Sequence, residues 1–171
     1  MMSLLLLLAC RSPVITLIPG QSTLVSPTQY RRSQDFSISS LIELACDISL
    51  STNLQWIIKN CTSTFCSYRI ILESKVITTL SELYIPSRTL DYGLYELTLT
   101  VIMTDVPSKR TSSTVYVRVT ATGITANPVQ LGTSMITRGS DQDLLLDPGT
   151  FSVDPDQDYF DASVSINQSS L

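Results

Sequence analysis

The chain has 171 residues, of which 43% are hydrophobic and 15% charged, and its formal net charge is −4. Such a length holds one ordinary domain or one and a half small ones. Histidine is absent, which excludes Ser-His-Asp and Cys-His catalytic groups and removes a common metal ligand. The acidic balance, with Lys and Arg scattered along the chain, offers no basic face to nucleic acid. We therefore expect no enzyme, no cofactor and no nucleic-acid partner.

Residues 1–11 contain a short apolar run from Leu4 to Ala9. The run is too short to span a bilayer, which takes roughly 20 residues. It lacks the positive stretch that normally precedes the apolar part of a secretory signal. Two interpretations stay open for this segment, a possible signal or an upstream strand of a longer protein.

Residues 41–122 read as short strands of period-two alternation separated by turn residues, a pattern typical of a β-sandwich. Two early strands, LIELACDI and NLQWIIKN, each place their apolar residues on one face: Ile42, Leu44, Cys46 and Ile48, then Leu54, Trp56 and Ile58. A Cys-bearing strand followed by a Trp-bearing strand invites comparison with immunoglobulin domains. The later strand supplies no second cysteine, so we predict that Trp56 anchors a core without that bridge.

Two later strands, LYELTLTVIM and STVYVRVTA, alternate most clearly. The residues expected to point inward are Tyr95, Leu97, Leu99, Val101 and Met103 in the first, and Val115, Val117, Val119 and Ala121 in the second. The connection DVPSKR between them predicts a hairpin loop. Before the first strand, the Leu-x-x-Gly-x-Tyr spelling predicts a turn in which Gly93 takes positive φ and Tyr95 packs near the corner.

A weak internal repeat links QYRRSQDFSISSLIEL, from Gln29, with MITRGSDQDLLLD, from Met135. Two similar modules in tandem would produce it, the second broken off after its opening strands. We therefore expect a module over residues 12–122, a linker over 123–128 and an incomplete second β-module over 129–171.

The four cysteines, Cys10, Cys46, Cys61 and Cys66, permit three pairings in an oxidising compartment. Cys61 and Cys66 are close enough to close a small loop, so we favour that bridge together with Cys10 to Cys46. Free buried cysteines are the alternative. A zinc site is disfavoured because no second short Cys pair and no histidine completes it.

Two stretches match the acceptor pattern for N-glycosylation, Asn60-Cys61-Thr62 and Asn167-Gln168-Ser169. The cysteine in the middle of the first makes it less efficient or dependent on the disulfide state. The expected glycosylation sites are Asn60 and Asn167, which together with the cysteines favour secretion.

The stretch DLLLDPGTFSVDPDQD gathers carboxylates near the end of the chain. Calcium needs about six or more oxygen ligands, and the candidates for it are Asp154, Asp156 and Asp158. The EF-hand spacing is absent, and Asp side chains in such a loop also bond backbone amides and cap turns. The turn-capping interpretation is sufficient, and no metal is required.

Several segments in order, namely ACRSPVITL, YRRSQDFSI, the Cys46 and Trp56 strands, YIPSRTLDYGLYELTLTV, the VYVRVTA strand and the run to DPD, resemble the receptor-for-egg-jelly (REJ) region of the polycystin family. The similarity covers residues 9–158. It implies an all-β fold: an immunoglobulin-like or fibronectin-like β-sandwich followed by the first strands of a second, truncated β-module.

The resemblance implies a non-catalytic extracellular module of a polycystin-like or egg-jelly-receptor-like membrane protein, in adhesion, ligand recognition or mechanical coupling. The alternative is a structural spacer with no ligand of its own. An extracellular protein or carbohydrate ligand is the expected partner, and membrane contact would belong to parts outside this chain. The expected location is the extracellular side of the membrane, or the medium if the fragment is expressed alone with a working signal.

Overall fold

The computed structural model describes residues 10–46, 50–72, 76–126 and 152–157. The chain divides into two compact units, Met1–Thr120 and Ala121–Leu171. The secondary structure of the described residues is strand and turn, without helix. Accordingly, no described segment forms a helix of the length and apolarity that crossing a membrane requires. The predicted all-β fold is confirmed.

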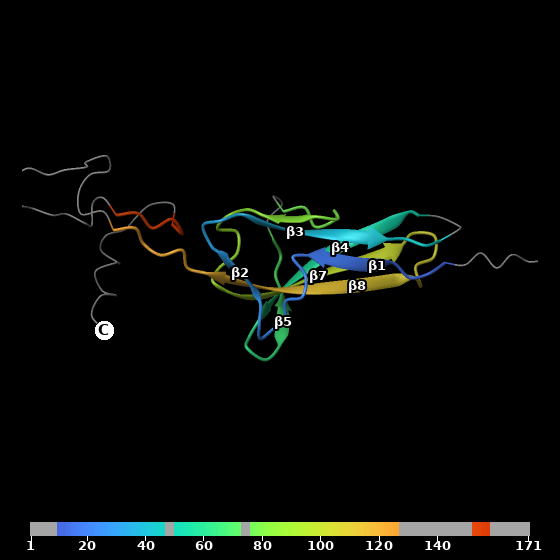
Figure 1. Ribbon diagram of the computed structural model, residues 1–171, viewed down its shortest axis with the longest axis horizontal. Helices are drawn as coiled ribbons and strands as arrows, with labels where there is room; N and C mark the ends of the chain where they lie inside the picture. The colour runs from blue at the N-terminus through green and yellow to red at the C-terminus, as the bar shows by residue number, and fades with distance from the viewer. Residues whose placement is uncertain (1–9, 47–49, 73–75, 127–151, 158–171) are drawn as a thin grey trace, which may run out of the picture. The chain divides into compact units, whose positions relative to one another are not determined.

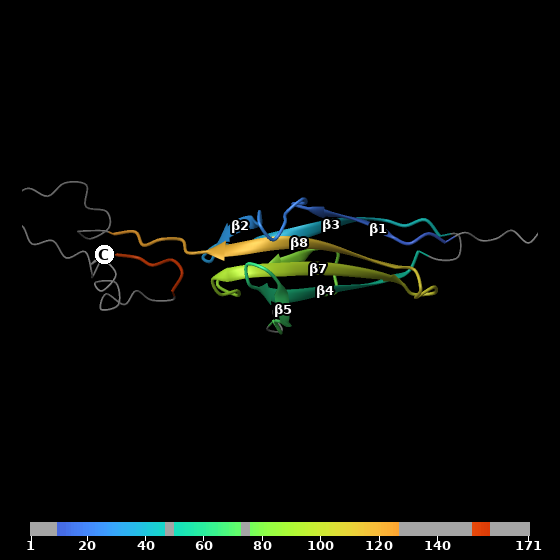
Figure 2. The same ribbon diagram turned by 90° about the horizontal axis from the view of Figure 1, so that it is seen from below.

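The described part of the first unit contains eight strands in two sheets. Their bounds are β1 (Val14–Ile18), β2 (Thr28–Arg31), β3 (Phe36–Glu43), β4 (Thr52–Cys61), β5 (Cys66–Arg69), β6 (Leu83–Ile85), β7 (Gly93–Met103) and β8 (Arg110–Thr120). The smaller sheet has the order β1-β3-β6 and the larger one the order β2-β8-β7-β4-β5. Figure 2 shows β1 and β3 in one layer and β7 and β4 in the other.

Strand pairing is antiparallel throughout except between β2 and β8, which run parallel. The long pairs β4·β7 and β7·β8 form the centre of the larger sheet (Figure 1). The two-sheet arrangement agrees with the expected sandwich. Its immunoglobulin-like or fibronectin-like character stays a prediction.

The core lies between the two sheets and follows the predicted alternation closely. On β4, β7 and β8 the buried side chains of the predicted inward faces are Trp56, Ile58, Tyr95, Leu97, Leu99, Val101, Met103, Val115, Val117 and Val119, and Cys61 and Leu94 are buried as well. From the smaller sheet the core receives Leu17, Phe36, Ile38, Leu83 and Ile85. β7 and β8 are joined as the predicted hairpin. The prediction is wrong at Ala121, which is exposed because β8 ends at Thr120.

The corner before β7 differs from the prediction in one detail. Gly93 does not take positive φ; it is the first residue of β7. The left-handed residue of this connection is Arg88, with φ 62. A Cβ at Gly93 would lie 3.5 Å from Tyr95 Oη, an ordinary contact distance, so neither space nor positive φ requires a glycine at this position.

The division between the units falls at Thr120 and Ala121, and the boundaries of the modules predicted from the sequence stay a prediction. In the second unit, Thr125 and Val153 form an isolated antiparallel bridge with N···O distances of 2.9 and 3.0 Å. The repeat from Met135 lies outside the described residues. The second module therefore stays a prediction.

Candidate functional site

The four cysteines form two pairs at disulfide distance. Cys10 and Cys46, with Cα atoms 4.1 Å apart, join the segment before β1 to the segment after β3. Cys61 and Cys66, with Cα atoms 3.9 Å apart, close the turn between β4 and β5. No cysteine is left free, since all four lie in the described part of the chain. Of the three pairings the sequence permits, the structure forms the favoured one.

The Asn60 acceptor site lies at the end of β4, beside a register shift between Asn60 and Cys61. The Asn60 side chain is exposed. The Thr62 hydroxyl of the same site accepts a hydrogen bond from the Phe65 amide at 3.2 Å and so takes part in the turn that the Cys61–Cys66 pair closes. An exposed asparagine leaves room for a glycan, which stays a prediction here. Asn167 lies outside the described residues.

The acidic loop of the second unit uses its carboxylates in hydrogen bonds to the chain. Asp156 is 2% exposed, and it accepts hydrogen bonds from the Thr122 amide at 2.7 Å and the Thr122 hydroxyl at 2.6 Å. Asp154 accepts one from the Asp156 amide at 3.0 Å. No group of three or more potential metal ligands occurs among the described residues, which exclude Asp158. This geometry is that of a capped turn.

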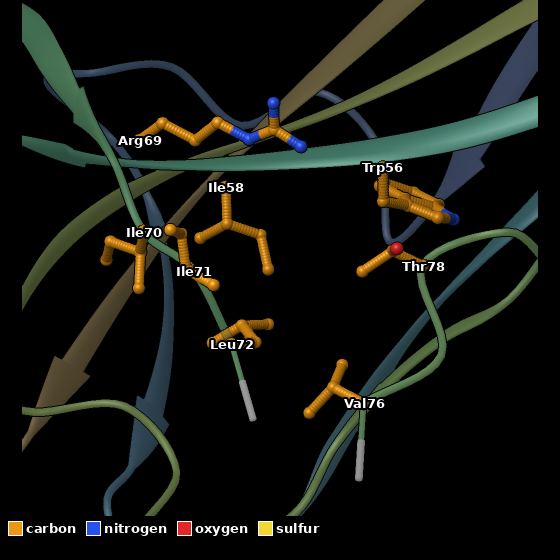
Figure 3. A pocket seen from close by; sticks show the side chains of 8 residues that line it. All are labelled: Trp56, Ile58, Arg69, Ile70, Ile71, Leu72, Val76 and Thr78. Atoms are coloured by element: carbon orange, nitrogen blue, oxygen red, sulfur yellow. The ribbon is translucent and has the colours of Figure 1, made fainter. Parts of the chain in front are cut away.

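A groove of about 190 Å³ opens beside β4. Its lining residues are Trp56, Ile58, Arg69, Ile70, Ile71, Leu72, Val76 and Thr78 (Figure 3). Figure 3 shows Ile70 and Ile71 on one side, Trp56 and Thr78 on the other, and Ile58 and Leu72 between them. Five of the lining residues are aliphatic, and the surface that the lining presents is divided about equally between polar and apolar atoms.

Two segments that flank this groove carry exposed apolar side chains. Around β5 these are Phe65, Tyr68 and Ile71, which are 57%, 78% and 92% exposed. Before β6 they are Ile77 and Leu80, which are 57% and 52% exposed. The alternation of the sequence does not predict these exposed apolar side chains. The available signal was the apolar run Ile70-Ile71-Leu72, which lacks the alternation of a half-buried strand.

The groove keeps its shape because Trp56 is fixed at both its backbone and its ring. The Trp56 amide donates to the Thr78 carbonyl at 2.8 Å, and Nε1 donates to the Leu80 carbonyl at 2.9 Å. The Trp56 side chain is only 1% exposed. A buried indole normally satisfies its N–H in this way, and here it attaches the segment before β6 to the edge of β4.

The outer face of the larger sheet carries paired polar side chains. Lys59 and Glu96, aligned on β4 and β7, form a salt bridge of 2.7 Å. Hydroxyl pairs continue the row between β7 and β8: Thr98 with Thr114 at 3.0 Å and Thr100 with Ser112 at 2.8 Å. These side chains pair with one another across neighbouring strands, and together they make the outer face of the sheet a regular polar surface.

Loops from two distant parts of the first unit meet near the corner. Arg32 forms a salt bridge of 3.3 Å with Asp91, and its guanidinium lies 5.4 Å from the centre of the Tyr92 ring. Tyr84 donates a hydrogen bond of 3.0 Å to Asp35. Asp91 is 89% exposed, so the ion pair itself stabilises little. These contacts bring together YRRSQDFSI and YIPSRTLDYGLYELTLTV, two of the segments on which the resemblance depends.

A family model described as the REJ domain matches residues 40–164, well over half of the chain. The chain belongs to the REJ domain family. The matched span begins within β3 and extends into the second unit, so the REJ domain is not confined to the predicted first module. No curated protein sequence matches the chain.

The hydrogen bond between Tyr95 and Asp91 closes the corner before β7, and a single substitution can remove it. Tyr95 is 2% exposed, and its hydroxyl donates to the Asp91 carbonyl at 2.7 Å, an arrangement also found near the start of a late strand in immunoglobulin domains. Tyr95→Phe keeps the ring and removes the bond, so we expect a loss of about 1 kcal/mol in unfolding free energy. Urea denaturation measures it. Tyr68→Phe, at a 78% exposed position, is the control, and equal effects of the two changes would contradict the assignment.

Alkaline pH should destabilise the domain through its tyrosines. Burial raises the pKa of Tyr95 above its usual value of 10.0, and the Asp91 charge adds to this while Arg32 opposes it. Burial, followed by Glu96, raises the pKa of Tyr116. A raised folded pKa means that the unfolded chain loses its protons first, so stability is fully present below pH 10 and falls as pH rises further.

The measurement is urea denaturation at a series of pH values from neutral to above 10, with tyrosine ionisation followed by near-ultraviolet absorbance. Tyr95→Phe and Tyr116→Phe should each make the decline shallower. A stability that stays constant while the tyrosines of the unfolded chain ionise would contradict this account.

Proposed function

We propose that this REJ domain is a non-catalytic extracellular module of a polycystin-like or egg-jelly-receptor-like membrane protein, and that it acts by recognising a ligand in adhesion or mechanical coupling. The observation that carries the proposal is the pairing of all four cysteines at disulfide distance in a REJ domain. Disulfides persist mainly in oxidising compartments such as the cell exterior.

The chemistry of the chain supports a non-catalytic role. Without histidine, acid–base catalysis would have to use carboxylates, lysines or tyrosines. Among the described residues, Glu96 is engaged with Lys59, and Asp156 with Thr122. Carboxylates held in this way maintain structure, and we assign them no chemistry on a substrate.

Ligand recognition is favoured by the apolar side chains beside the β4 groove. Ile71 and Tyr68 are among the most exposed hydrophobic residues described, and they belong to the segment that lines or borders the groove. Exposed apolar groups gathered at one place are typical of interaction sites. A protein or carbohydrate outside the cell is the expected ligand.

The spacer role is the second candidate. The paired hydroxyls and the Lys59–Glu96 bridge on the outer sheet face offer no apolar contact. A module of this kind would separate its neighbours and bear load without a ligand of its own.

A multivalent binding assay distinguishes the two roles. The oxidised domain, tetramerised through a terminal tag, is applied to intact cells and to cells pretreated with protease or glycosidases. Recognition predicts saturable binding, and the treatment that abolishes it identifies protein or carbohydrate as the ligand class. Binding no greater than that of a tetramer carrying the tag alone, on cells from several tissues, would contradict recognition and favour the spacer.

A further inference from the structure

The Asn60 acceptor site begins in a paired strand. Asn60 is aligned with Tyr95 of β7 on one side and with Tyr68 of β5 on the other. Its backbone is therefore held between two neighbouring strands, although its side chain is exposed. Acceptor sequences of this pattern normally lie in surface loops. The folded domain thus presents the asparagine to solvent but leaves the chain around it little freedom to adapt to an enzyme.

The Thr62 hydroxyl, which the acceptor pattern requires, is used inside the turn. It donates to the Phe65 carbonyl at 3.1 Å and accepts from the Phe65 and Thr64 amides at 3.2 and 3.4 Å. The Thr64 hydroxyl also lies 3.4 Å from it. A hydroxyl has one proton to donate and two lone pairs with which to accept. The turn therefore takes up the hydrogen-bonding capacity that an enzyme recognising this residue would need.

The Cys61–Cys66 bridge holds this turn closed. The two cysteines are register partners across β4 and β5, separated by 5 positions, and Thr62 lies between them. β5 has four residues, three of which are exposed. Segments with few buried contacts open locally at low cost in free energy. Without the bridge, we expect β5 to leave β4 and to release Asn60 and Thr62 from their partners.

Glycosylation and bridging therefore compete for the newly made chain. Glycosylation joins the side-chain nitrogen of Asn60 to the anomeric carbon of a lipid-pyrophosphate-linked oligosaccharide, with loss of an amide proton and departure of the lipid pyrophosphate. Bridging joins the two sulfurs, and the disulfide of an oxidoreductase takes up two electrons and two protons. Disulfide formation takes seconds to hours, depending on the oxidant. This is slow enough for the glycan to be added first on part of the chains.

A glycan at Asn60 would change the neighbouring surface. Directly opposed residues of an antiparallel pair lie on the same face, with Cβ atoms about 4.5–5.5 Å apart. Tyr68 is the partner of Asn60 on β5, and its side chain is 78% exposed. Because a glycan is bulky and polar, it would cover the Tyr68 ring, whereas an unmodified Asn60 leaves the ring open.

We propose that the Cys61–Cys66 bridge controls the glycosylation of Asn60: the glycan is added only while the turn is open, and a chain that bridges first keeps Asn60 unmodified and Tyr68 uncovered. A glycosylated chain can still form the bridge, because the Asn60 side chain is exposed in the closed turn. The domain then exists in two bridged forms with different surfaces beside β5. This inference rests on the proposed extracellular role, which takes the chain through an oxidising compartment.

The test follows the order of the two reactions in the full chain. Asn167→Gln is introduced throughout, so that Asn60 is the one remaining acceptor site of the sequence. The chain is translated behind a heterologous secretion signal into microsomes and pulse-labelled. During the chase, the gel shift removed by glycosidase reports the glycan, and thiol alkylation reports the bridge. We expect glycosylated chains to form the bridge later and bridged chains to gain no glycan. Glycan addition to chains already bridged would overturn the inference.

Cys66→Ser and Cys46→Ser form a matched pair of variants. Each removes one bridge and leaves one cysteine unpaired, but only Cys66→Ser opens the turn, and it preserves Asn60-Cys61-Thr62. Cys66→Ser should raise the glycosylated fraction severalfold, and Cys46→Ser should leave it at the wild-type level. The glycan is scored on new chains, so a variant that fails to fold still reports. Equal fractions in the wild type and Cys66→Ser, or an equal rise in both variants, would overturn the inference.

Nitration by tetranitromethane tests the covering of Tyr68 in the two bridged forms, which a lectin column separates. Tyr68 should react severalfold more slowly in the glycosylated form. Tyr84, which is 50% exposed on β6, should react at the same rate in both. Equal rates at Tyr68 would contradict the proposed difference in surface.

The proposed extracellular role fails separately. Four free thiols in the secreted, folded wild type would contradict that role. Glycosylation of Asn60 that does not depend on Cys66, in a chain with both bridges formed, leaves the role standing and overturns this inference alone.

Discussion

Replacing Trp56 by alanine should destabilise the domain by about 3–5 kcal/mol, the usual range for truncating a buried aromatic side chain. Trp56 is 1% exposed in the core between the sheets. The change leaves a cavity and also removes the Nε1 hydrogen bond to Leu80, which holds the segment before β6 against β4. Against a typical total stability of about 5–15 kcal/mol, such a loss leaves a marginally folded protein.

The measurement is urea denaturation followed by far-ultraviolet circular dichroism, since the variant has no tryptophan to report by fluorescence. Trp56→Phe should lose less, because it retains an aromatic ring and gives up the indole N–H. Ile71→Ala, on a 92% exposed residue, should change stability by less than about 0.5 kcal/mol. An unfolding midpoint for Trp56→Ala equal to that of Ile71→Ala would show that Trp56 does not anchor the core.

The second large effect concerns the disulfides, which should contribute unequally. Cys10 and Cys46 are separated by 36 positions, and Cys61 and Cys66 by 5. A cross-link restricts the unfolded chain more when it closes a longer loop, which gives about 4 kcal/mol for the first bridge and about 2 kcal/mol for the second. The double change Cys10→Ser with Cys46→Ser should therefore destabilise the domain more than Cys61→Ser with Cys66→Ser.

Urea denaturation without reductant compares the two double variants with the wild type, and the reduced wild type should be less stable than either. The test is which of the two double variants has the lower unfolding free energy. A larger loss from removing the Cys61–Cys66 bridge would contradict the loop-length account and would assign to the β4–β5 turn a greater role in holding the edge of the sheet.

The sequence predicts the sheets well where a strand has one buried and one exposed face. Tyr95, Leu97 and Leu99 are buried as their alternation indicates, because only one face of β7 meets the opposing sheet. The prediction that Ala121 points inward was wrong because alternation alone does not show where a strand ends. The prediction for Gly93 was wrong because the spacing of residues does not show which one takes positive φ, and in this connection it is Arg88.

The groove could not be predicted in the same way. It depends on hydrogen bonds from β4 to two segments that are separated along the chain, Trp56 to Thr78 and Ile58 to Ile70. Contacts between segments that are distant along the chain cannot be read from the local sequence pattern. The cysteine pairing was more accessible, because proximity along the chain favours Cys61 with Cys66 and leaves one other pair.

Disulfide mapping of the secreted protein tests the central claim, that this REJ domain is a disulfide-supported extracellular module, most directly. The chain is expressed in eukaryotic cells behind a heterologous secretion signal, digested without reduction after thiol blocking, and analysed by mass spectrometry. The account predicts peptides linked through Cys10–Cys46 and through Cys61–Cys66, with no blocked thiol. Four blocked thiols in soluble, folded protein, or bridges that cross between the two pairs, would contradict it.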